Sequence, residues 1–317
     1  MALTGGIMSD APPPLELLDG LVDLVEVSDQ DGLARELPNA EVLFVWDFAN
    51  ADIADLIPLA PRLRWVHVAA VGVNAVISQQ LIEAGVLLTN SRGVFDGAMA
   101  EYVVGQLIAW FKDFPGTAAL QQQRRWQHRM TRTLADSRMV VVGTGSIGRR
   151  IADTLRFFGA DVTLVGRRPG TDPVYGEIRP SSELAAIVAG QDGLILAPPL
   201  TPGTRGMVDR EVLESLGPNG YLINVGRGPL IVESDLIKVL ELQGLAGVAL
   251  DVFEVEPLPA KSPLWGFREV VVSPHMSGDY VGFDRDLVEL FADQLRRRAA
   301  GQPLINVVDT GLGYVPS

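Results

Sequence analysis

Arg227 is the residue of this sequence whose setting first suggests chemistry on a small anion. It lies between Gly226 and Gly228, directly after the apolar run LINV. A guanidinium can bind a carboxylate through two parallel hydrogen bonds, and glycines let a backbone turn sharply or approach a ligand closely. Taken alone, the segment is equally compatible with an exposed loop arginine, so the other residues of the chain must distinguish the two interpretations.

The chain contains three histidines, and one of them has the setting of an acid–base group. His67 interrupts the apolar run LRWVHVAA and is expected in a core, whereas His128 lies in a basic segment and is expected at the surface. His275 follows the run VVVSP, at the predicted end of a strand, where parallel α/β sheets usually bind their ligands. Imidazole exchanges protons near neutral pH, so His275 is the predicted general acid.

A carboxylate beside His275 would stabilise the charged form of its ring. The segment LDVFEVEPLP supplies two candidates, Glu254 and Glu256, and spacing alone does not choose between them. Either could instead be a solvated loop acid. A cationic anchor and a proton donor together are what hydride transfer to a ketone requires.

A glycine-rich segment, VVVGTGSIGRR, has the pattern of a loop that binds a dinucleotide. Gly143, Gly145 and Gly148 follow an apolar run and precede a helical pattern. In such loops the glycines allow a tight turn and a close approach of pyrophosphate to the helix N-terminus. The predicted contacts include the neighbouring Ser146 and Ile147. The alternative is that the glycines only shape a turn between strand and helix.

The strand after this loop ends at Gly166, where NAD-binding domains usually place an acid for the ribose hydroxyl. Arg167 and Arg168 follow. The missing carboxylate and the two guanidiniums favour a 2′-phosphate, and so NADP(H) over NAD(H). The alternative is that both arginines are exposed loop residues and that either cofactor is accepted.

Alternating apolar and helical segments must position these residues. Strands are predicted at 41–46, 63–70, 85–90, 138–143, 161–166, 193–198, 220–225, 246–253 and 269–274, and helices at 97–114, 146–158, 181–189, 209–216, 233–243 and 280–300. Such alternation indicates parallel sheets, so the expected fold class is α/β with two doubly wound domains. The turn-rich segment SRGVFDGAMAE places the boundary near residue 96.

Composition excludes several other classes of protein. The 317 residues include no cysteine, which excludes disulfides and thiolate chemistry. A net charge of −13 disfavours nucleic acid as a partner, and no apolar run reaches the roughly 18 residues that would suggest a membrane span. Without a recognisable signal peptide, the expected location is the cytoplasm. The basic segment 121–138 is expected to be a solvated connection or a subunit contact.

Five segments, in this order, resemble the D-isomer-specific 2-hydroxyacid dehydrogenase family: GTGSIG, APPLTPGTRG, NVGRGPLI, ALDVFEVEPLP and SPHMSG. They span most of residues 97–290, and VHVAAVGVNAV matches more loosely in the first part of the chain. The resemblance implies that Arg227 binds the substrate carboxylate and keto group, that His275 is the acid, and that Glu256 is its partner. It adds further cofactor contacts at Pro198, Pro199, Thr204, Val225, Gly226, Asp251, Ser277 and Gly278, and substrate contacts at Val71, Gly72, Val73 and Trp46. For Trp46, a place in the core is an equal alternative.

The resemblance also implies a flavodoxin-like substrate domain (1–96 with 288–317), a Rossmann-type cofactor domain (97–287), a cleft between them, no metal, and a homodimer formed through the cofactor domain. Together with Arg167, Arg168 and Trp46, the resemblance favours NADPH-dependent reduction of a small 2-oxo acid, of the glyoxylate or hydroxypyruvate type, to the D-2-hydroxy acid. Two alternatives stay open: an NAD-dependent dehydrogenase for another acid (D-lactate-like, phosphoglycerate-like or bulkier), and a non-enzymatic NAD(P)-sensing protein like the co-repressors built on this fold.

Overall fold

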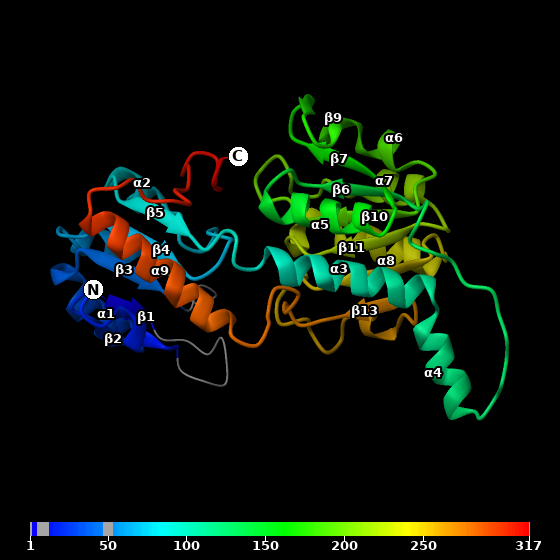
Figure 1. Ribbon diagram of the computed structural model, residues 1–317, viewed down its shortest axis with the longest axis horizontal. Coiled ribbons are helices and arrows are strands. Elements are labelled where there is room, and N and C mark those ends of the chain that lie inside the picture. The colour runs from blue at the N-terminus through cyan, green and yellow to red at the C-terminus, as the bar shows by residue number, and fades with distance from the viewer. Residues whose placement is uncertain (1, 5–12, 47–52, 317) are drawn as a thin grey trace. The chain divides into compact units, whose positions relative to one another are not determined.

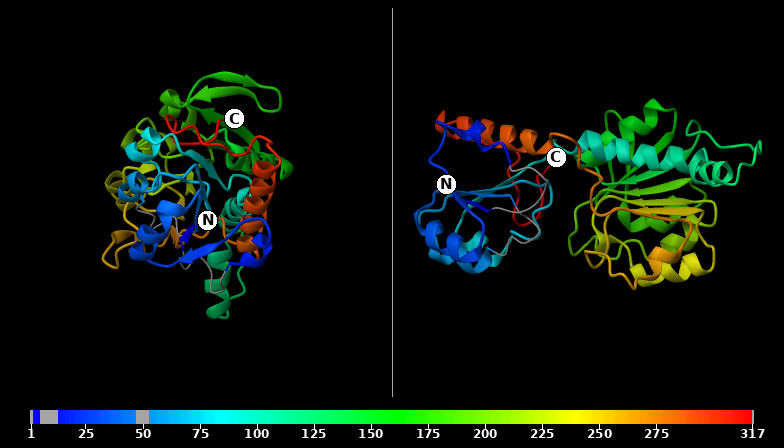
Figure 2. Two further views of the ribbon diagram at one scale, coloured as in Figure 1. Left: turned by 90° about the vertical axis from the view of Figure 1, so that its left-hand side faces the viewer. Right: turned by 90° about the horizontal axis from the view of Figure 1, so that it is seen from below.

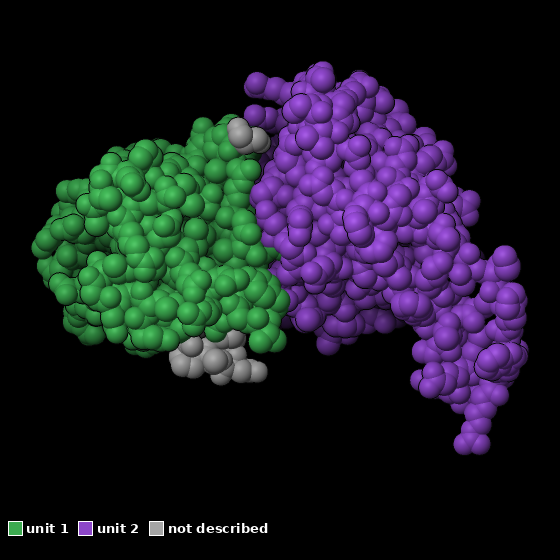
Figure 3. Space-filling model, in the orientation of Figure 1, with its two compact units in different colours: residues 1–95, 280–317 green, residues 96–279 purple. Residues whose placement is uncertain are grey.

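The computed structural model describes residues 2–4, 13–46 and 53–316. The chain forms two compact units (Figure 3). Unit 1 consists of Met1–Phe95 with Tyr280–Ser317, and unit 2 consists of Asp96–Asp279. The boundaries predicted from the sequence lie between residues 96 and 97 and between residues 287 and 288.

Unit 1 is built on a parallel five-stranded sheet with the order β2-β1-β3-β4-β5 (Figure 1). The strands are β1 (Ala2–Thr4), β2 (Val25–Val27), β3 (Val42–Val45), β4 (Trp65–Val68) and β5 (Leu87–Asn90). This is the order of flavodoxin-like sheets. The helix α9 (Phe283–Ala299) covers one face, and α1 (Gln30–Glu36) and α2 (Gln79–Glu83) cover the other (Figure 2).

Alternation along β3 explains how unit 1 fills both faces of its sheet, because successive strand residues point to opposite sides. Leu43 and Val45 belong to the aliphatic core of this unit. Phe44, between them, stacks on Phe291 of α9 with ring centroids 4.3 Å apart. The C-terminal helix is therefore part of the core of unit 1.

Unit 2 contains an eight-stranded sheet with the order β13-β12-β11-β10-β6-β7-β9-β8. Its strands are β6 (Arg138–Val142), β7 (Asp161–Gly166), β8 (Gly170–Asp172), β9 (Gly176–Pro180), β10 (Gly193–Leu196), β11 (Tyr221–Asn224), β12 (Gly247–Leu250) and β13 (Val270–Val272). All pairs are parallel except β8 with β9. The strand order reverses beside β6, which is the point where doubly wound sheets bind dinucleotides.

Helices complete two hydrophobic cores in unit 2. One core packs α3 (Asp96–Phe111) and α5 (Ser146–Phe157) on the sheet, and the other packs α6 (Leu184–Val188), α7 (Arg210–Leu216) and α8 (Glu233–Glu241). The predicted α/β class is thus confirmed. Two features of unit 2 were not predicted: the β8–β9 hairpin, and the helix α4 (Phe114–Gln122), which begins where the predicted helix 97–114 ends. In unit 1, the elements β1, β2, α1 and α2 were not predicted either.

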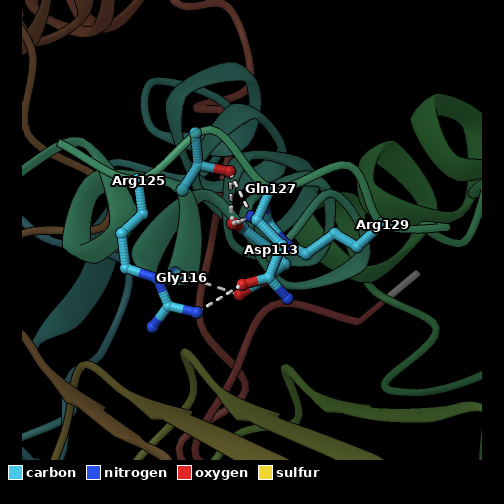
Figure 4. Close-up of polar contacts among 6 residues, drawn as sticks. Asp113, Gly116, Arg125, Gln127 and Arg129 are labelled. Carbon is cyan, nitrogen blue, oxygen red and sulfur yellow. Dashed lines mark hydrogen bonds and ion pairs between the residues drawn. The ribbon is translucent and has the colours of Figure 1, made fainter. Parts of the chain in front are cut away.

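The segment 114–137 protrudes from the body of unit 2 over most of its length and is braced at its base (Figure 1), and only its end returns to the core, at Leu134. Asp113 caps α4 by accepting a hydrogen bond from the Gly116 amide at 3.0 Å. The Arg129 guanidinium, on the returning chain, pairs with the Asp113 carboxylate at 2.7 Å and also bonds Thr117 (Figure 4). The protrusion is therefore a structured arm.

No helix of the described residues has the length and apolar character needed to cross a membrane.

Candidate active site

The loop that carries Arg227 leaves the end of β11 and is shaped by Asn224. The buried Asn224 side chain accepts a hydrogen bond from the Gly226 amide at 3.1 Å and donates one to the Arg227 carbonyl at 3.0 Å. Arg227 itself has an extended backbone, is half-buried, and donates to the Gly226 carbonyl at 2.7 Å. Asn224 had no predicted role, although a buried polar residue at a strand end was a usable signal.

The two glycines around Arg227 are required by neighbouring protein atoms. A Cβ on Gly228 would lie 1.9 Å from the carbonyl carbon of Phe253, so the segment that leads to Glu256 crosses directly over this position. A Cβ on Gly226 would lie 2.8 Å from Leu230 and 3.1 Å from the Pro198 carbonyl oxygen. Gly226 and Gly228 thus let two loops meet beside Arg227 without a clash.

Glu256 is the acid that pairs with His275, and Glu254 is not. One Glu256 carboxylate oxygen lies 2.7 Å from His275 Nδ1, and the other accepts a hydrogen bond from the Phe253 amide at 2.9 Å. Burial alone would raise the pKa of Glu256, but the His275 and Phe253 hydrogen bonds and the charge of Arg227 lower it below its usual value. The carboxylate is therefore ionised near neutral pH and interacts with both Arg227 and His275.

Burial lowers the pKa of Arg227, and the charge of Glu256 opposes this shift. A guanidinium remains charged in proteins despite such shifts. Arg227, Glu256 and His275 are thus brought into one electrostatic group. Because Nδ1 of His275 is engaged by Glu256, Nε2 is the ring nitrogen that can exchange a proton with a ligand.

His275 adopts a left-handed backbone conformation, with φ of 56°. A non-glycine residue there is strained unless its surroundings hold it. The buried Asp251 does so: its carbonyl accepts from the His275 amide at 2.9 Å, and its carboxylate accepts from the Met276 and Ser277 amides, both at 2.9 Å. Asp251 therefore fixes the loop that carries the imidazole, in addition to the cofactor contact expected from the resemblance.

A hydrogen-bonded chain extends this support to α3. Ser273 donates to the Asp251 carboxylate at 2.6 Å, and the hydroxyl oxygens of Ser273 and Tyr102 lie 2.6 Å apart. Burial raises the pKa of Tyr102, so its phenol stays protonated at neutral pH. Tyr102 is more than 170 positions from Ser273 in sequence, and no local pattern could have linked them.

The glycine loop between β6 and α5 fits a pyrophosphate. Cβ atoms on Gly143 and Gly148 would meet backbone atoms, at 2.8 Å from the Ala197 oxygen and 2.0 Å from the Gly143 oxygen. A Cβ on Gly145 would meet none of the described residues within 4 Å, although Gly145 caps the N-terminus of α5. The open space at Gly145 leaves room for a ligand to approach this backbone, and a helix N-terminus suits an anion.

Comparison with known proteins identifies the family of the region that contains the glycine loop and the Arg227, Glu256 and His275 group. The sequence model of the D-isomer specific 2-hydroxyacid dehydrogenase NAD binding domain matches residues 104–277. The chain belongs to the D-isomer-specific 2-hydroxyacid dehydrogenase family. It is therefore an NAD(P)-dependent oxidoreductase of 2-hydroxy and 2-oxo acids, and unit 2 contains its nicotinamide-cofactor-binding domain.

Three relatives illustrate how this dehydrogenase compares with known members. It is 30% identical over 299 residues to glyoxylate/hydroxypyruvate reductase A of Serratia proteamaculans, which covers 89% of this chain and 95% of the relative. It is 30% identical over 287 residues to hydroxyphenylpyruvate reductase of Plectranthus scutellarioides, with 89% of each covered. A family member from Xanthobacter autotrophicus Py2, solved with NADPH and MES, has a TM-score of 0.85 at 29% identity, covering 99% of both chains.

The other predicted cofactor residues of this dehydrogenase lie around the carboxyl ends of its strands. Pro198, Pro199 and Thr204 follow β10, and the Thr204 hydroxyl closes this loop by bonding the Pro199 carbonyl at 2.7 Å. Ser146 and Ile147 begin α5, and the Ser146 hydroxyl donates to Asp96 at 3.2 Å. Val225 is buried after β11, and Ser277 and Gly278 follow His275. Arg167 and Arg168 are exposed directly after β7.

The predicted substrate residues lie in unit 1. Val71 and Gly72 are half-buried and Val73 is buried, in a turn after β4 where Asn90 donates to the Val71 carbonyl at 2.6 Å. Trp46 is only 1% exposed and packs edge-on against Phe44. This burial agrees with the alternative that Trp46 is a core residue.

Proposed function

We propose that this dehydrogenase uses NADPH to reduce a small 2-oxo acid, of the glyoxylate or hydroxypyruvate type, to the D-2-hydroxy acid. The observation that carries the proposal is the 2.7 Å bond between His275 Nδ1 and Glu256, in electrostatic contact with Arg227. Similarity to a glyoxylate/hydroxypyruvate reductase over most of both chains supports the substrate class.

Each side chain has a defined task in this proposal. Bound NADPH supplies the hydride for the carbonyl carbon. Arg227 binds the substrate carboxylate and keto oxygen, because its planar guanidinium can reach two oxygens at once. His275 donates a proton from Nε2 to the oxygen that becomes the hydroxyl, and Glu256 stabilises the imidazolium before the transfer. The backbone amides of residues 71–73 are assigned to the substrate carboxylate.

The test is oxidation of NADPH by the purified protein with a panel of 2-oxo acids that includes glyoxylate, hydroxypyruvate, pyruvate and 4-hydroxyphenylpyruvate. We expect the highest kcat/KM with one of the first two. His275→Ala should abolish turnover and leave NADPH binding unchanged. No turnover with any acid would exclude the proposed activity and favour a nucleotide-sensing protein like the co-repressors built on this fold.

A bulkier substrate is the second candidate, because hydroxyphenylpyruvate reductase is equally similar to this chain at 30% identity. That relative acts, by its name, on an aromatic 2-oxo acid. A higher kcat/KM with 4-hydroxyphenylpyruvate than with glyoxylate would select this candidate. The roles of Arg227, Glu256 and His275 are the same for both, since both substrates share the 2-oxo carboxylate.

The preference for NADPH is proposed from the end of β7. Gly166 offers no carboxylate, and the exposed Arg167 and Arg168 follow it. The NADPH complex of the Xanthobacter relative is in line with this choice. Replacing both arginines with serine should weaken NADPH binding about 10- to 100-fold and NADH binding little, since charged hydrogen bonds contribute about 1.5–3 kcal/mol. An unchanged ratio of the two dissociation constants would exclude these arginines as the 2′-phosphate site.

We also propose that two copies associate through the arm, residues 114–137 of unit 2. Trp126 is fully exposed and Met130 is 89% exposed on this braced segment. Its base is further fixed by Arg132, which bonds Asp192 and lies over the Phe111 ring. Large apolar side chains held in water on a structured segment indicate an interface. The arm is basic whereas the chain carries a net charge of −13, so a second copy offers it complementary charge.

Light scattering tests the association directly. The wild-type protein should have the mass of a dimer, and Trp126→Glu should shift it toward the monomer. Phe157→Glu is a matched control, because Phe157 is also highly exposed but lies on α5, outside the arm. A wild-type monomer, or equal behaviour of the two variants, would exclude the arm as the interface.

A further inference from the structure

Arg149, the residue after the last glycine of the cofactor loop, contacts that loop from within α5. Its Nε donates to the Thr144 carbonyl at 2.9 Å, and Thr144 lies between Gly143 and Gly145. The other end of the same guanidinium pairs with the Asp172 carboxylate at 2.6 Å. One planar side chain therefore joins the glycine loop to the β8–β9 hairpin.

The hairpin is shaped to receive this arginine. Asp172 is 8% exposed, and its second oxygen accepts from the Val174 and Tyr175 amides at 2.9 and 3.1 Å. The Tyr175 ring lies 5.4 Å from the Arg149 guanidinium, and its single hydroxyl proton is within reach of two acceptors, Asp153 at 2.7 Å and the Arg149 carbonyl at 3.1 Å. The Arg149 hydrogen bond lowers the pKa of Asp172 to about 2, so this carboxylate is ionised at neutral pH.

This hairpin begins where β7 ends, so its position determines the path of residues 167–169. Gly166 contacts the glycine loop directly, since a Cβ there would lie 3.2 Å from the Thr144 methyl carbon. The glycine loop is thus contacted at two places, by Gly166 at the end of β7 and, through Arg149, by the hairpin. Of these two contacts, the Arg149 bridge is polar, and its charged hydrogen bonds fix the relative orientation of the groups that they join.

We propose that Arg149, Asp172 and Tyr175 are positioning residues that hold the glycine loop and the 167–168 loop in one fixed arrangement for the phosphates of NADP(H). The part that concerns the glycine loop needs only nicotinamide cofactor binding. The part that concerns the 2′-phosphate rests on the NADPH preference proposed above. None of the three residues needs to touch the cofactor for this role.

Asp172→Asn separates positioning from simple charge. The asparagine oxygen can still accept the Val174 and Tyr175 amides, while its NH₂ group cannot accept from Arg149. The change also removes a negative charge near the phosphate loop, which by electrostatics alone would tighten the binding of an anion. A positioning role predicts weaker NADPH binding instead, so the direction in which the dissociation constant of NADPH changes distinguishes the two explanations.

The dissociation constants of NADPH and NADH are measured by fluorescence titration of the intact protein, together with its melting temperature. We expect Asp172→Asn to weaken NADPH binding about 10-fold, as the loss of a charged hydrogen bond suggests. With saturating NADPH, kcat and the KM for the 2-oxo acid should stay unchanged. Arg149→Lys keeps the charge but cannot bridge both partners, and should weaken binding similarly. Arg150→Lys, at the exposed neighbouring position, is the matched control.

Unchanged or tighter NADPH binding in folded Asp172→Asn would overturn the proposal, as would equal losses in Arg149→Lys and Arg150→Lys. Should Asp172→Asn fail to fold, Tyr175→Phe decides instead, because it keeps the ring and removes only the hydroxyl that bonds Asp153 and the Arg149 carbonyl. A wild-type protein that binds NADH as tightly as NADPH would contradict the cofactor preference alone. The variants would then be expected to weaken both cofactors equally.

Discussion

A single buried carboxylate, Asp251, holds the strained residue that would donate the proton. We predict that Asp251→Asn lowers the free energy of unfolding by about 2 kcal/mol. Both carboxylate oxygens of Asp251 accept hydrogen bonds, so the side-chain NH₂ group of the asparagine would face another donor. The loop of His275 would lose its left-handed geometry, and kcat should fall at least 10-fold. Chemical denaturation and steady-state kinetics measure the two effects.

Ser273→Ala is the control for Asp251→Asn, since it removes one donor to the carboxylate and leaves the Met276 and Ser277 bonds in place. Ser273→Ala should lower the free energy of unfolding and kcat less than Asp251→Asn does. A folded Asp251→Asn protein with wild-type kcat would show that the loop keeps its geometry without the carboxylate.

His67 makes the stability of unit 1 depend on pH. Burial lowers the pKa of His67 to about 3, and its ring is hydrogen-bonded as the neutral form between Thr89 at 2.7 Å and Ser91 at 3.4 Å. The unfolded chain binds a proton near pH 6.5, whereas the folded chain does not until about pH 3. Stability is therefore fully present above pH 6.5 and should fall by about 1.4 kcal/mol per unit as the pH decreases below it.

Urea denaturation between pH 4 and pH 7 measures this dependence (the interval follows from the two pKa values). His67→Gln should be less stable at pH 7 but should lose less stability toward pH 4 than the wild type. His128→Gln, on the exposed arm, should follow the wild-type curve. Parallel curves for wild type and His67→Gln would contradict the burial of a neutral imidazole.

At the scale of elements, α3 contributes to the site through one phenol. Tyr102→Phe removes the hydrogen bond to Ser273 and preserves the ring that packs beside the sheet. We predict a several-fold lower kcat, an unchanged dissociation constant for NADPH, and a loss of stability of about 1 kcal/mol. Tyr314→Phe, near the end of the chain in unit 1, is a control for removing a phenol elsewhere. A kcat equal to that of the wild type would mean that α3 does not support the loop.

Elements that bury apolar residues continuously were predictable from sequence, and those held by polar contacts were not. β6, β10 and β11 are wholly or almost wholly buried and were predicted to within two residues at each end. The β8–β9 hairpin, GTDPVYGEIRP, is mostly polar and exposed, and is held by Arg149, Asp172 and Tyr175. The helix α4 buries none of its residues, so it offered no apolar periodicity.

The same distinction applies to the site. Arg227, Glu256 and His275 could be proposed because each stands in a short recognisable segment, and the structure brings them together. Spacing alone left Glu254 and Glu256 open, the resemblance selected Glu256, and in the structure Glu256 lies 2.7 Å from His275 Nδ1. Contacts such as Tyr102 with Ser273 depend on how distant elements pack, and a single sequence does not contain that information.

At the scale of the whole molecule, the two units have separate hydrophobic cores. Unit 1 depends on a helix from the far end of the chain, because Phe291 of α9 stacks on Phe44 and His67 at centroid distances of 4.3 and 5.1 Å and lies 5.2 Å from Trp65. The residues assigned to the cofactor lie in unit 2. The two units should therefore respond differently to a change in the core of unit 1 and to ligand.

We predict that Phe291→Ala destabilises unit 1 by about 3–5 kcal/mol, as expected when a fully buried phenylalanine is truncated. Calorimetry should then show two unfolding transitions, with unit 1 unfolding first. Added NADPH should raise the temperature of the later transition more than that of the earlier one, since a ligand stabilises the unit that binds it. Phe157→Ala, at an exposed phenylalanine of unit 2, is the control and should change neither transition by more than about 1 kcal/mol. A single transition for Phe291→Ala, shifted as a whole by NADPH, would show instead that the two units unfold as one cooperative body.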